Sequence, residues 1–255
     1  FVILIPFVQM TVFGPASGRF SVLSVFGNDR IIDEINIERT EQDGKFERIF
    51  HNKIVGWGEV IVANYVRSFS PDFLFVRGDP NPRHSVPGTG VLYWAYLPFL
   101  LFGIYKLFSN HDEAKIIVLG WLALAPIASS LTVDGANHAT RLFLMIPPLI
   151  FIIAFGVYQF LEIQFKWRKL ILILSLIFLF GNGLFYIHRY FMHYGFQMWR
   201  YWHYGFKEAM QGVVENQDNY SLVFVNNTYE PSLLHYLFYS KYRPADFQAK
   251  FISDA

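Results

Sequence analysis

The sequence of residues 142–161 is LFLMIPPLIFIIAFGVYQFL, which contains no charged side chain. A helix needs about 17–25 mostly apolar residues to cross the hydrocarbon core of a membrane, and this stretch is long enough. It also lacks the polar face that a helix on the surface of a soluble protein presents to water. Three other stretches are similar, with Lys106 as their single charge: residues 90–108, 116–133 and 170–187. The sequence therefore predicts four transmembrane helices within residues 90–188.

The composition agrees with a membrane protein and excludes several other classes. Hydrophobic residues make up 53% of the 255 residues, and charged residues make up only 16%, compared with about a quarter in soluble domains. Of the 21 basic and 20 acidic residues, only ten lie between residues 91 and 187. A net charge of +1 gives little drive for the release of phosphate counterions, so we expect no nucleic-acid partner. Because cysteine is absent, disulfides, thiolate metal sites and cysteine nucleophiles are excluded.

The chain opens on an apolar stretch, FVILIPFVQMTVF, at residues 1–13. This stretch is too short to span a membrane and lacks the basic flank of a signal peptide. We therefore expect residues 1–13 to be the end of a truncated transmembrane helix, and the chain to be the C-terminal portion of a longer protein.

The short loops predict the orientation in the membrane. Basic residues cluster around the loops 109–115 and 165–169, which the positive-inside rule places in the cytoplasm. The loop 134–141 then lies outside, together with residues 14–89 and the tail 189–255. This topology predicts a multi-pass integral membrane protein in contact with membrane lipids.

The extracytoplasmic loop 14–89 is expected to be ordered. Residues 31–37 alternate weakly in polarity, which is compatible with a short strand or with the start of a helix. Residues 43–65 place apolar side chains three and four positions apart, which predicts an amphipathic helix on the bundle or in the membrane interface. Gly56 and Gly58 weaken that helix. Proline and glycine are dense in residues 77–90, which predicts a cluster of turns.

The tail 189–255 is predicted to be a small α/β domain. Residues 206–214 and 230–239 have helical spacing, and residues 220–225 (YSLVFV) have the composition of a buried strand. A strand between two helices is typical of an α/β layer. The predicted fold class is thus an α-helical polytopic membrane protein: a helix bundle with an extracytoplasmic loop segment and a small C-terminal α/β extracytoplasmic domain.

The outer end of the third predicted span carries the first candidate site. His138 and Arg141 are three positions apart in DGANHATR, so both side chains can point to one side of a helix N-terminus. Such an N-terminus with an arginine fork can bind a phosphate through free N–H groups, the helix dipole and paired hydrogen bonds. The alternative is an interfacial arginine that reaches the lipid headgroups, with His138 capping the loop.

The turn cluster before residue 90 carries the second candidate site. Arg77, Asp79, Arg83 and His84 lie within eight positions, at the same predicted membrane face as His138 and Arg141. Two basic clusters at one interface suit the phosphate or diphosphate of a lipid carrier. The alternative is a purely structural turn in which Asp79 pairs with an arginine.

Several other chemistries are not indicated by the sequence. The remaining histidines show neither an HExxH motif nor paired ligand spacing, so we expect no metal site. The GxSxG, P-loop and GxGxxG fingerprints are absent, and no cofactor is expected.

Four motifs together carry a resemblance to a known family. They are GDPNPRHSVPGTG at residues 78–90, LPFLLFGIY at residues 97–105, NHATR at residues 137–141 with IPPLIF downstream, and WHYGFKEAM at residues 202–210. In this order they resemble the C-terminal half of bacterial GT-C glycosyltransferases, in the branch near protein-O-mannosyltransferases and lipid A aminoarabinose transferases. The resemblance covers nearly the whole chain, and the HxxR spacing of His138 and Arg141 is its most specific part.

The resemblance implies a polytopic enzyme that uses a polyprenyl-phosphate-linked sugar as donor. The sugar would pass to a protein, lipid or glycan acceptor on the external face. In this family the catalytic carboxylate lies in the first external loop, so we expect the base upstream of Phe1 and expect this chain alone to be inactive. By the same analogy, His138 and Arg141 would bind the carrier phosphate, with Arg83, His84 and Arg77 as further phosphate-binding candidates.

Two alternatives to this function come from other classes. A non-enzymatic transporter or flippase for a lipid-linked substrate would use broken helices, which Pro147-Pro148 and Gly181-Asn182-Gly183 could supply. The absence of charge from the span interiors counts against it. The other alternative is an external scaffold whose tail binds cell-envelope partners.

Overall fold

A computed structural model describes residues 22–41, 47–109, 114–227 and 231–251, together with Gln9 and Gly18. The truncated helix predicted for residues 1–13 lies outside the described residues, except for Gln9. The chain divides into two compact units, residues 1–190 and residues 191–255, which are described separately below.

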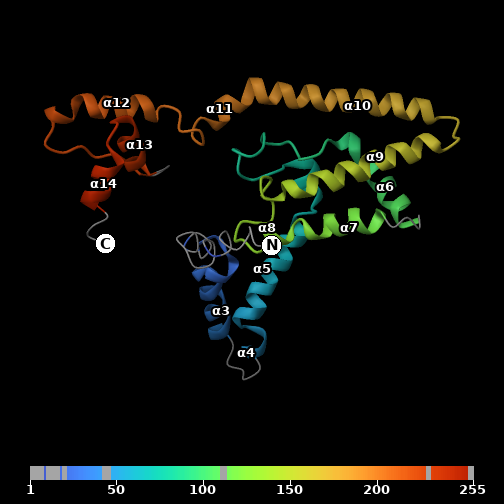
Figure 1. Ribbon diagram of the computed structural model, residues 1–255, viewed down its shortest axis with the longest axis horizontal. Coiled ribbons are helices and arrows are strands. Elements are labelled where there is room, and N and C mark those ends of the chain that lie inside the picture. The colour runs from blue at the N-terminus through green and yellow to red at the C-terminus, as the bar shows by residue number, and fades with distance from the viewer. Residues whose placement is uncertain are drawn as a thin grey trace. The chain divides into compact units, whose positions relative to one another are not determined.

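The described chain is mostly helical (Figure 1). The larger unit contains the α-helices α3 (Asp29–Glu41), α4 (Glu47–Phe50), α5 (Lys53–Arg67), α6 (Leu97–Ser109), α7 (Ala114–Leu124), α8 (Ile127–Ser130), α9 (Ile146–Glu162) and α10 (Arg168–His188). It also has the short 3-10 turns η2 (Val25–Gly27), η4 (Trp94–Tyr96) and η5 (Leu142–Met145), and the π-helix η3 (Asp72–Val76). The only β-type pairing among the described residues is one isolated bridge between Ser24 and Thr132.

The core of the larger unit lies where α9 packs on α6 and α7, which run beside it (Figure 1). Met145, Leu149 and Ile152 are almost completely buried there. Two glycines permit the close approach of α6 and α9. A Cβ atom on Gly103 would collide with the carbonyl oxygen of Ile152, and one on Gly156 would collide with that of Phe99.

Among the described residues, two helices are long enough and apolar enough to cross a membrane, Leu142–Glu162 and Arg168–Met198. The other two predicted spans are shorter helices, Trp94–Ser109 and Lys115–Ser130. Residues 90–93 are not helical, because the backbone at Gly90 lies against Phe75 so closely that a Cβ atom would collide with it. Pro126 separates α7 from α8, since proline has no N–H to continue the helix.

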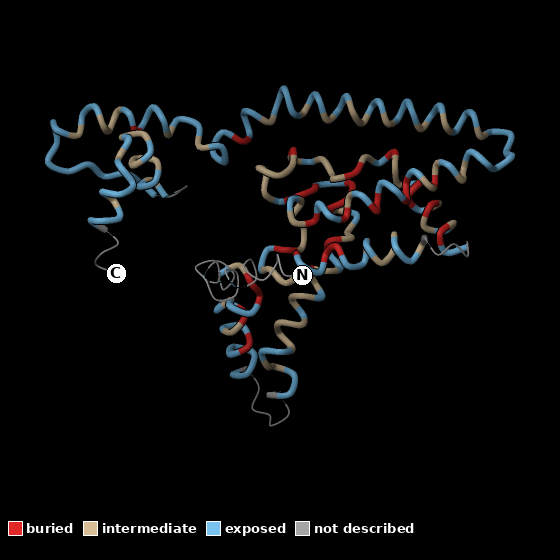
Figure 2. Tube along the Cα trace, in the orientation of Figure 1, coloured by how far each residue is buried: buried red, intermediate tan, exposed pale blue. Residues whose placement is uncertain are grey.

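The two apolar helices differ in how they are covered. About two fifths of the most apolar window of α9 is buried, whereas none of the corresponding window of α10 is. Figure 2 shows α10 exposed or half-buried along its length. Neither interruption that would favour a transporter breaks a helix. Pro147 and Pro148 lie in the first turn of α9, and α10 continues through residues 181–183.

The helical hairpin of α3 and α5 decides between the two alternatives for residues 31–37 and corrects the single helix predicted for residues 43–65. Residues 31–37 belong to a helix rather than a strand, with Ile31 and Ile35 buried against α5. The single helix predicted for residues 43–65 is divided, because Asn52 accepts hydrogen bonds from the N–H groups of Ile54 and Val55 and so begins α5. Gly56 is useful rather than harmful there, since a Cβ atom would collide with Ile35.

The smaller unit differs from the α/β domain predicted for the tail. It contains α11 (Gly195–Met198), α12 (Phe206–Asn216), η7 (Gln217–Asn219), α13 (Ser232–Tyr239) and α14 (Pro244–Phe251), and the π-helix η6 (Arg189–Tyr194) leads into it from α10. The strand prediction for residues 220–225 is wrong. These residues are exposed, and the described part of the chain contains no strand with which they could pair. Within this unit, α12 packs on α13.

Candidate functional site

The C-terminal end of α5 positions the loop that precedes α9. The side chain of Asn64 donates to the carbonyl oxygens of Ser130 (3.3 Å) and Thr132 (2.9 Å). One turn later, the hydroxyl of Ser68 donates to the carbonyl oxygen of Ala136 over 3.1 Å. Both side chains are buried, so these hydrogen bonds fix the loop in a place that excludes water.

The turn cluster at residues 77–90 follows the π-helix η3, whose residues Phe73–Phe75 are buried in the core. Two of its glycines have a backbone that other residues rarely adopt, with φ of +69° at Gly78 and +74° at Gly88. The Asp79 carboxylate accepts from the N–H of Asn81 (2.7 Å), and the Ser85 hydroxyl donates to the Asp79 carbonyl oxygen (2.9 Å). The cluster is therefore an ordered set of turns, as predicted.

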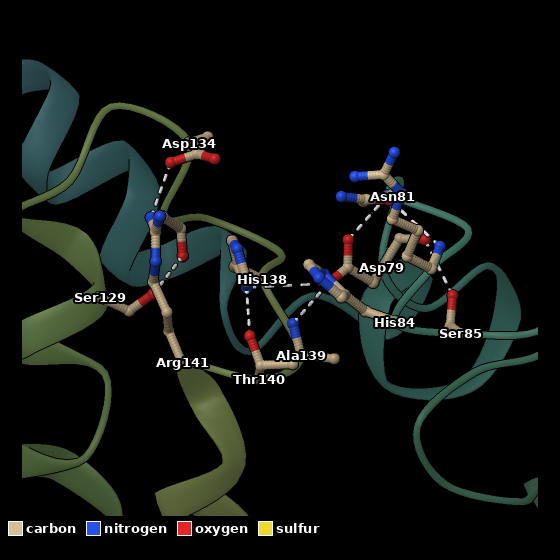
Figure 3. A network of polar contacts seen from close by, with 12 residues as sticks. Asp79, Asn81, His84, Ser85, Ser129, Asp134, His138, Ala139, Thr140 and Arg141 are labelled. Carbon is tan, nitrogen blue, oxygen red and sulfur yellow. Dashed lines mark hydrogen bonds and ion pairs between the residues drawn. The ribbon is translucent and has the colours of Figure 1, made fainter. Parts of the chain in front are cut away.

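The two loops meet at the carboxylate of Asp79 (Figure 3). Its Oδ2 accepts a 2.7 Å hydrogen bond from the backbone N–H of Ala139, sixty positions away in the sequence. The same oxygen lies 2.9 Å from Nδ1 of His84 and 3.9 Å from Nδ1 of His138. The side chain of Asp79 is only 2% exposed. One buried carboxylate thus joins both predicted site segments.

The two histidines lie beside each other, one from each loop. Their ring centroids are 4.6 Å apart and the ring planes are inclined by 33°. Nδ1 of His138 also lies 2.9 Å from the hydroxyl of Thr140. Burial lowers the pKa of His138, and the positive charge of Arg141 lowers it further, while Asp79 acts in the opposite direction. His138 is therefore a neutral imidazole at neutral pH.

Arg141 is directed to its own loop. Its Nη1 donates to the hydroxyl of Thr132 and to the carboxylate of Asp134, both over 2.6 Å. Partial burial raises the pKa of Asp134, but the hydrogen bond and charge of Arg141 outweigh this effect and hold the pKa below its usual value. The Asp134 carboxylate is therefore ionised and paired at neutral pH.

The helix N-terminus predicted beside His138 lies elsewhere. The N–H groups of Arg141 and Leu142 both donate to the carbonyl oxygen of His138, and a four-residue 3-10 turn precedes α9. The α-helix begins only at Ile146, and its second and third residues are prolines without N–H groups. Free backbone donors at a helix end therefore do not support phosphate binding at this site, and any such binding falls to the side chains.

The other predicted site residues take different places. Arg77 pairs with Asp72 over 2.7 Å and is largely exposed, so Asp79 is partnered by histidine and backbone rather than by this arginine. The backbone N–H of Arg83 donates to the Asn81 side chain, and Arg83 is half-buried. Of the five candidates, His84 and His138 are brought together. Asp79, which links them, was noted only as a member of the turn, and no local signal in the sequence marks it as the centre.

Known proteins do not identify this site either. No protein-family model, curated protein or solved structure matches the chain.

The chemistry of the cluster follows from its three donors. One ligand atom from each of Asp79, His84 and His138 lies within 4.8 Å of the others, so the three can bind one cation together. The carboxylate also orients the His84 ring, which can then give or take a proton at its other nitrogen.

A pocket of about 180 Å³ lies at the other end of the same turn cluster. It separates residues 88–94 from α10 and is lined by aromatic side chains, among them Tyr93, Trp94 and Phe185. Nε of Arg189, at the end of α10, is buried without a hydrogen-bond partner, and its guanidinium group lies beside Gly88. The turn cluster thus borders both a polar site and an apolar pocket.

Proposed function

We propose that this chain belongs to a GT-C-type membrane glycosyltransferase. It would transfer a sugar from a polyprenyl-phosphate-linked donor to an acceptor on the external face of the membrane. In this proposal residues 90–188 form four membrane helices, with the shorter helices as spans beside α9 and α10. Residues 14–89 and the tail then lie outside the cytoplasm.

The observation that carries the proposal is the meeting of the two loops at Asp79. The segments with the GDPNPRHSVPGTG and NHATR motifs are far apart in the sequence, yet one carboxylate joins them through His84 and the N–H of Ala139. The proposed donor site takes polar groups from both of these segments. The aromatic pocket beside the same turn cluster offers space for part of a lipid chain.

The side chains suit the departure of a lipid phosphate. When the acceptor oxygen attacks the sugar, the bond to the phosphate oxygen breaks and negative charge grows on the phosphate. The described hydrogen bonds of the Arg141 side chain all come from Nη1, so its other N–H groups can bind a phosphate oxygen. His138, neutral at neutral pH, contributes a hydrogen bond rather than a charge.

The experiment is a transfer assay with the intact parent protein in lipid vesicles containing a polyprenyl-phosphate-linked sugar. Removing a donor that stabilises a transition-state charge costs about 10²–10³-fold in rate, so we expect that loss for Arg141→Ala. Arg30→Ala is the matched control, because the Arg30 side chain is exposed on α3 and, among the described residues, pairs with Glu34 of the same helix. Unchanged transfer by Arg141→Ala would remove the role assigned to Arg141.

The parent reading frame provides an independent check. An Asp or Glu in the loop after its first span is required by the proposal. If that loop contains no carboxylate, the glycosyltransferase interpretation fails whatever the variants do.

A further inference from the structure

The cluster of Asp79, His84 and His138 has the donor set of a metal site. Within the described part of the chain, it is the one group of three such residues whose ligand atoms lie close enough to share an ion. Its members come from two loops, so neither loop alone contains a ligand pattern. This is why the sequence gives no metal motif although the structure assembles the donors.

The site is organised before any ion binds. Oδ1 of Asp79 accepts from the N–H of Asn81, and Oδ2 accepts from the N–H of Ala139. These two bonds hold the carboxylate between the imidazoles, whose side chains are only 22% (His84) and 15% (His138) exposed. Ligands that are already fixed and partly buried lose little conformational freedom when an ion binds, which favours specific binding of one ion over nonspecific electrostatic attraction of cations.

We propose that Asp79, His84 and His138 bind one divalent transition-metal ion of the zinc class. Two imidazole nitrogens with one carboxylate oxygen suit Zn²⁺, whereas Mg²⁺ and Ca²⁺ are bound mainly by oxygen. Three protein ligands leave one position of a tetrahedral shell for water or for an anionic oxygen such as that of a phosphate. This proposal goes beyond the proposed function and does not depend on it.

The distances require only a small adjustment. Ligand atoms bound at about 2.0–2.2 Å in a tetrahedral shell lie about 3.4 Å apart. The 3.9 Å between Asp79 and His138 is slightly longer than this, and the 2.9 Å between Asp79 and His84 is slightly shorter. When the ion binds Nδ1 of His84, the single proton of the neutral imidazole is carried on Nε2, so the hydrogen bond between His84 and Asp79 is replaced by two metal–ligand bonds and the ring stays neutral.

The test measures metal binding directly on the full chain in detergent micelles. The protein is stripped with a chelator and then dialysed against Zn²⁺ or Co²⁺, and the bound metal is counted by mass spectrometry. We expect about one ion per chain. Replacement of a metal ligand costs more than the roughly 10–100-fold in affinity lost on changing its supporting partners, so His84→Ala and His138→Ala should each weaken binding at least about 100-fold.

The matched control is His51→Ala. His51 lies 2.8 Å from Glu38 in a histidine–carboxylate pair on the α3–α5 hairpin, but it belongs to no described cluster of three ligands. Binding should be unchanged in this variant. The absence of stoichiometric Zn²⁺ and Co²⁺ from the wild type would overturn the proposal. So would equal binding by the His84→Ala/His138→Ala double variant.

Two further measurements keep the result interpretable. Circular dichroism and the melting temperature identify variants that fail to fold, and His138→Gln replaces the imidazole with a polar side chain of similar reach if His138→Ala is unstable. Metal binding is measured without a sugar donor. Zinc binding without transfer would therefore contradict the glycosyltransferase proposal alone, and transfer without zinc binding would contradict this inference alone.

Discussion

Asp79 and Asp134 lie in the two loops that meet at the candidate site, yet their surroundings are opposite. The Asp79 side chain is 2% exposed and accepts hydrogen bonds from two backbone N–H groups and His84. The Asp134 side chain is 64% exposed and pairs with Arg141 of its own loop. A carboxylate therefore joins distant segments when it is buried among donors, whereas an exposed ion pair adds little to the stability of the fold.

The largest effect should come from Asp79→Ala. This change leaves the N–H groups of Asn81 and Ala139 without their acceptor in a buried place, which costs about 3–5 kcal/mol of unfolding free energy. Unfolding of the full chain in mixed micelles, followed by circular dichroism, measures it. Asp72→Ala is the control, because Asp72 pairs with the exposed Arg77. If both variants unfold at the same denaturant concentration, Asp79 does not hold the loops together.

A smaller loss is expected for Asn64→Ala. Asn64 is buried in α5 and donates to two carbonyl oxygens of the loop that contains Asp134. Its removal should cost about 1–3 kcal/mol in the same unfolding measurement, since those acceptors lose their donor. Asn182→Ala serves as control, because the Asn182 side chain bonds only within α10. A neutral Asn64→Ala would mean that other contacts fix this loop, such as the hydrogen bond from Ser68 to Ala136.

Asp134→Asn should change stability least. Exposed ion pairs contribute about 0–1 kcal/mol, and the effect should shrink further as salt is added. The melting temperature of wild type and variant at low and high ionic strength measures it. A loss of stability as large as that of Asp79→Ala would mean that the exposed and the buried carboxylate contribute equally to the stability of the fold.

The stability that the Asp134 carboxylate contributes should depend on pH. Its pKa is held below the usual value, so its stabilisation is present above the unfolded-state pKa and is lost as pH falls through the folded-state pKa. The difference in melting temperature between wild type and Asp134→Asn should therefore be constant near neutral pH, decrease as the pH falls below the unfolded-state pKa of about 4, and vanish below the folded-state pKa. A difference that grows on acidification would contradict the lowered pKa.

Features set by local sequence could be predicted, and those set by contacts between distant segments could not. The apolar runs predicted α9 and α10, and the dense prolines and glycines predicted the turns at residues 77–90. The length of the first predicted span was overestimated because Gly90 lies against Phe75, a tertiary contact with no local signal.

The site was predicted in the same uneven way. His84 and His138 were chosen from their positions beside predicted spans, and the fold brings them together. The role of Asp79 depends on an N–H group sixty positions away, which no pattern in either loop reveals. Arg141 is predicted at a helix N-terminus but lies before the 3-10 turn η5, where its side chain contacts Thr132 and Asp134 of the same loop.

The contact between the glycines of α6 and α9 has an evolutionary consequence. At Gly103 and Gly156 any side chain meets the backbone of the other helix, so mutation at either position meets strong selection. Along α10, where no residue is buried, exchange among leucine, isoleucine and phenylalanine disturbs the internal packing much less. The sequences of these helices should therefore diverge at very different rates. The helices α6 and α9 should retain Gly103 and Gly156, whereas α10 should retain only its hydrophobicity.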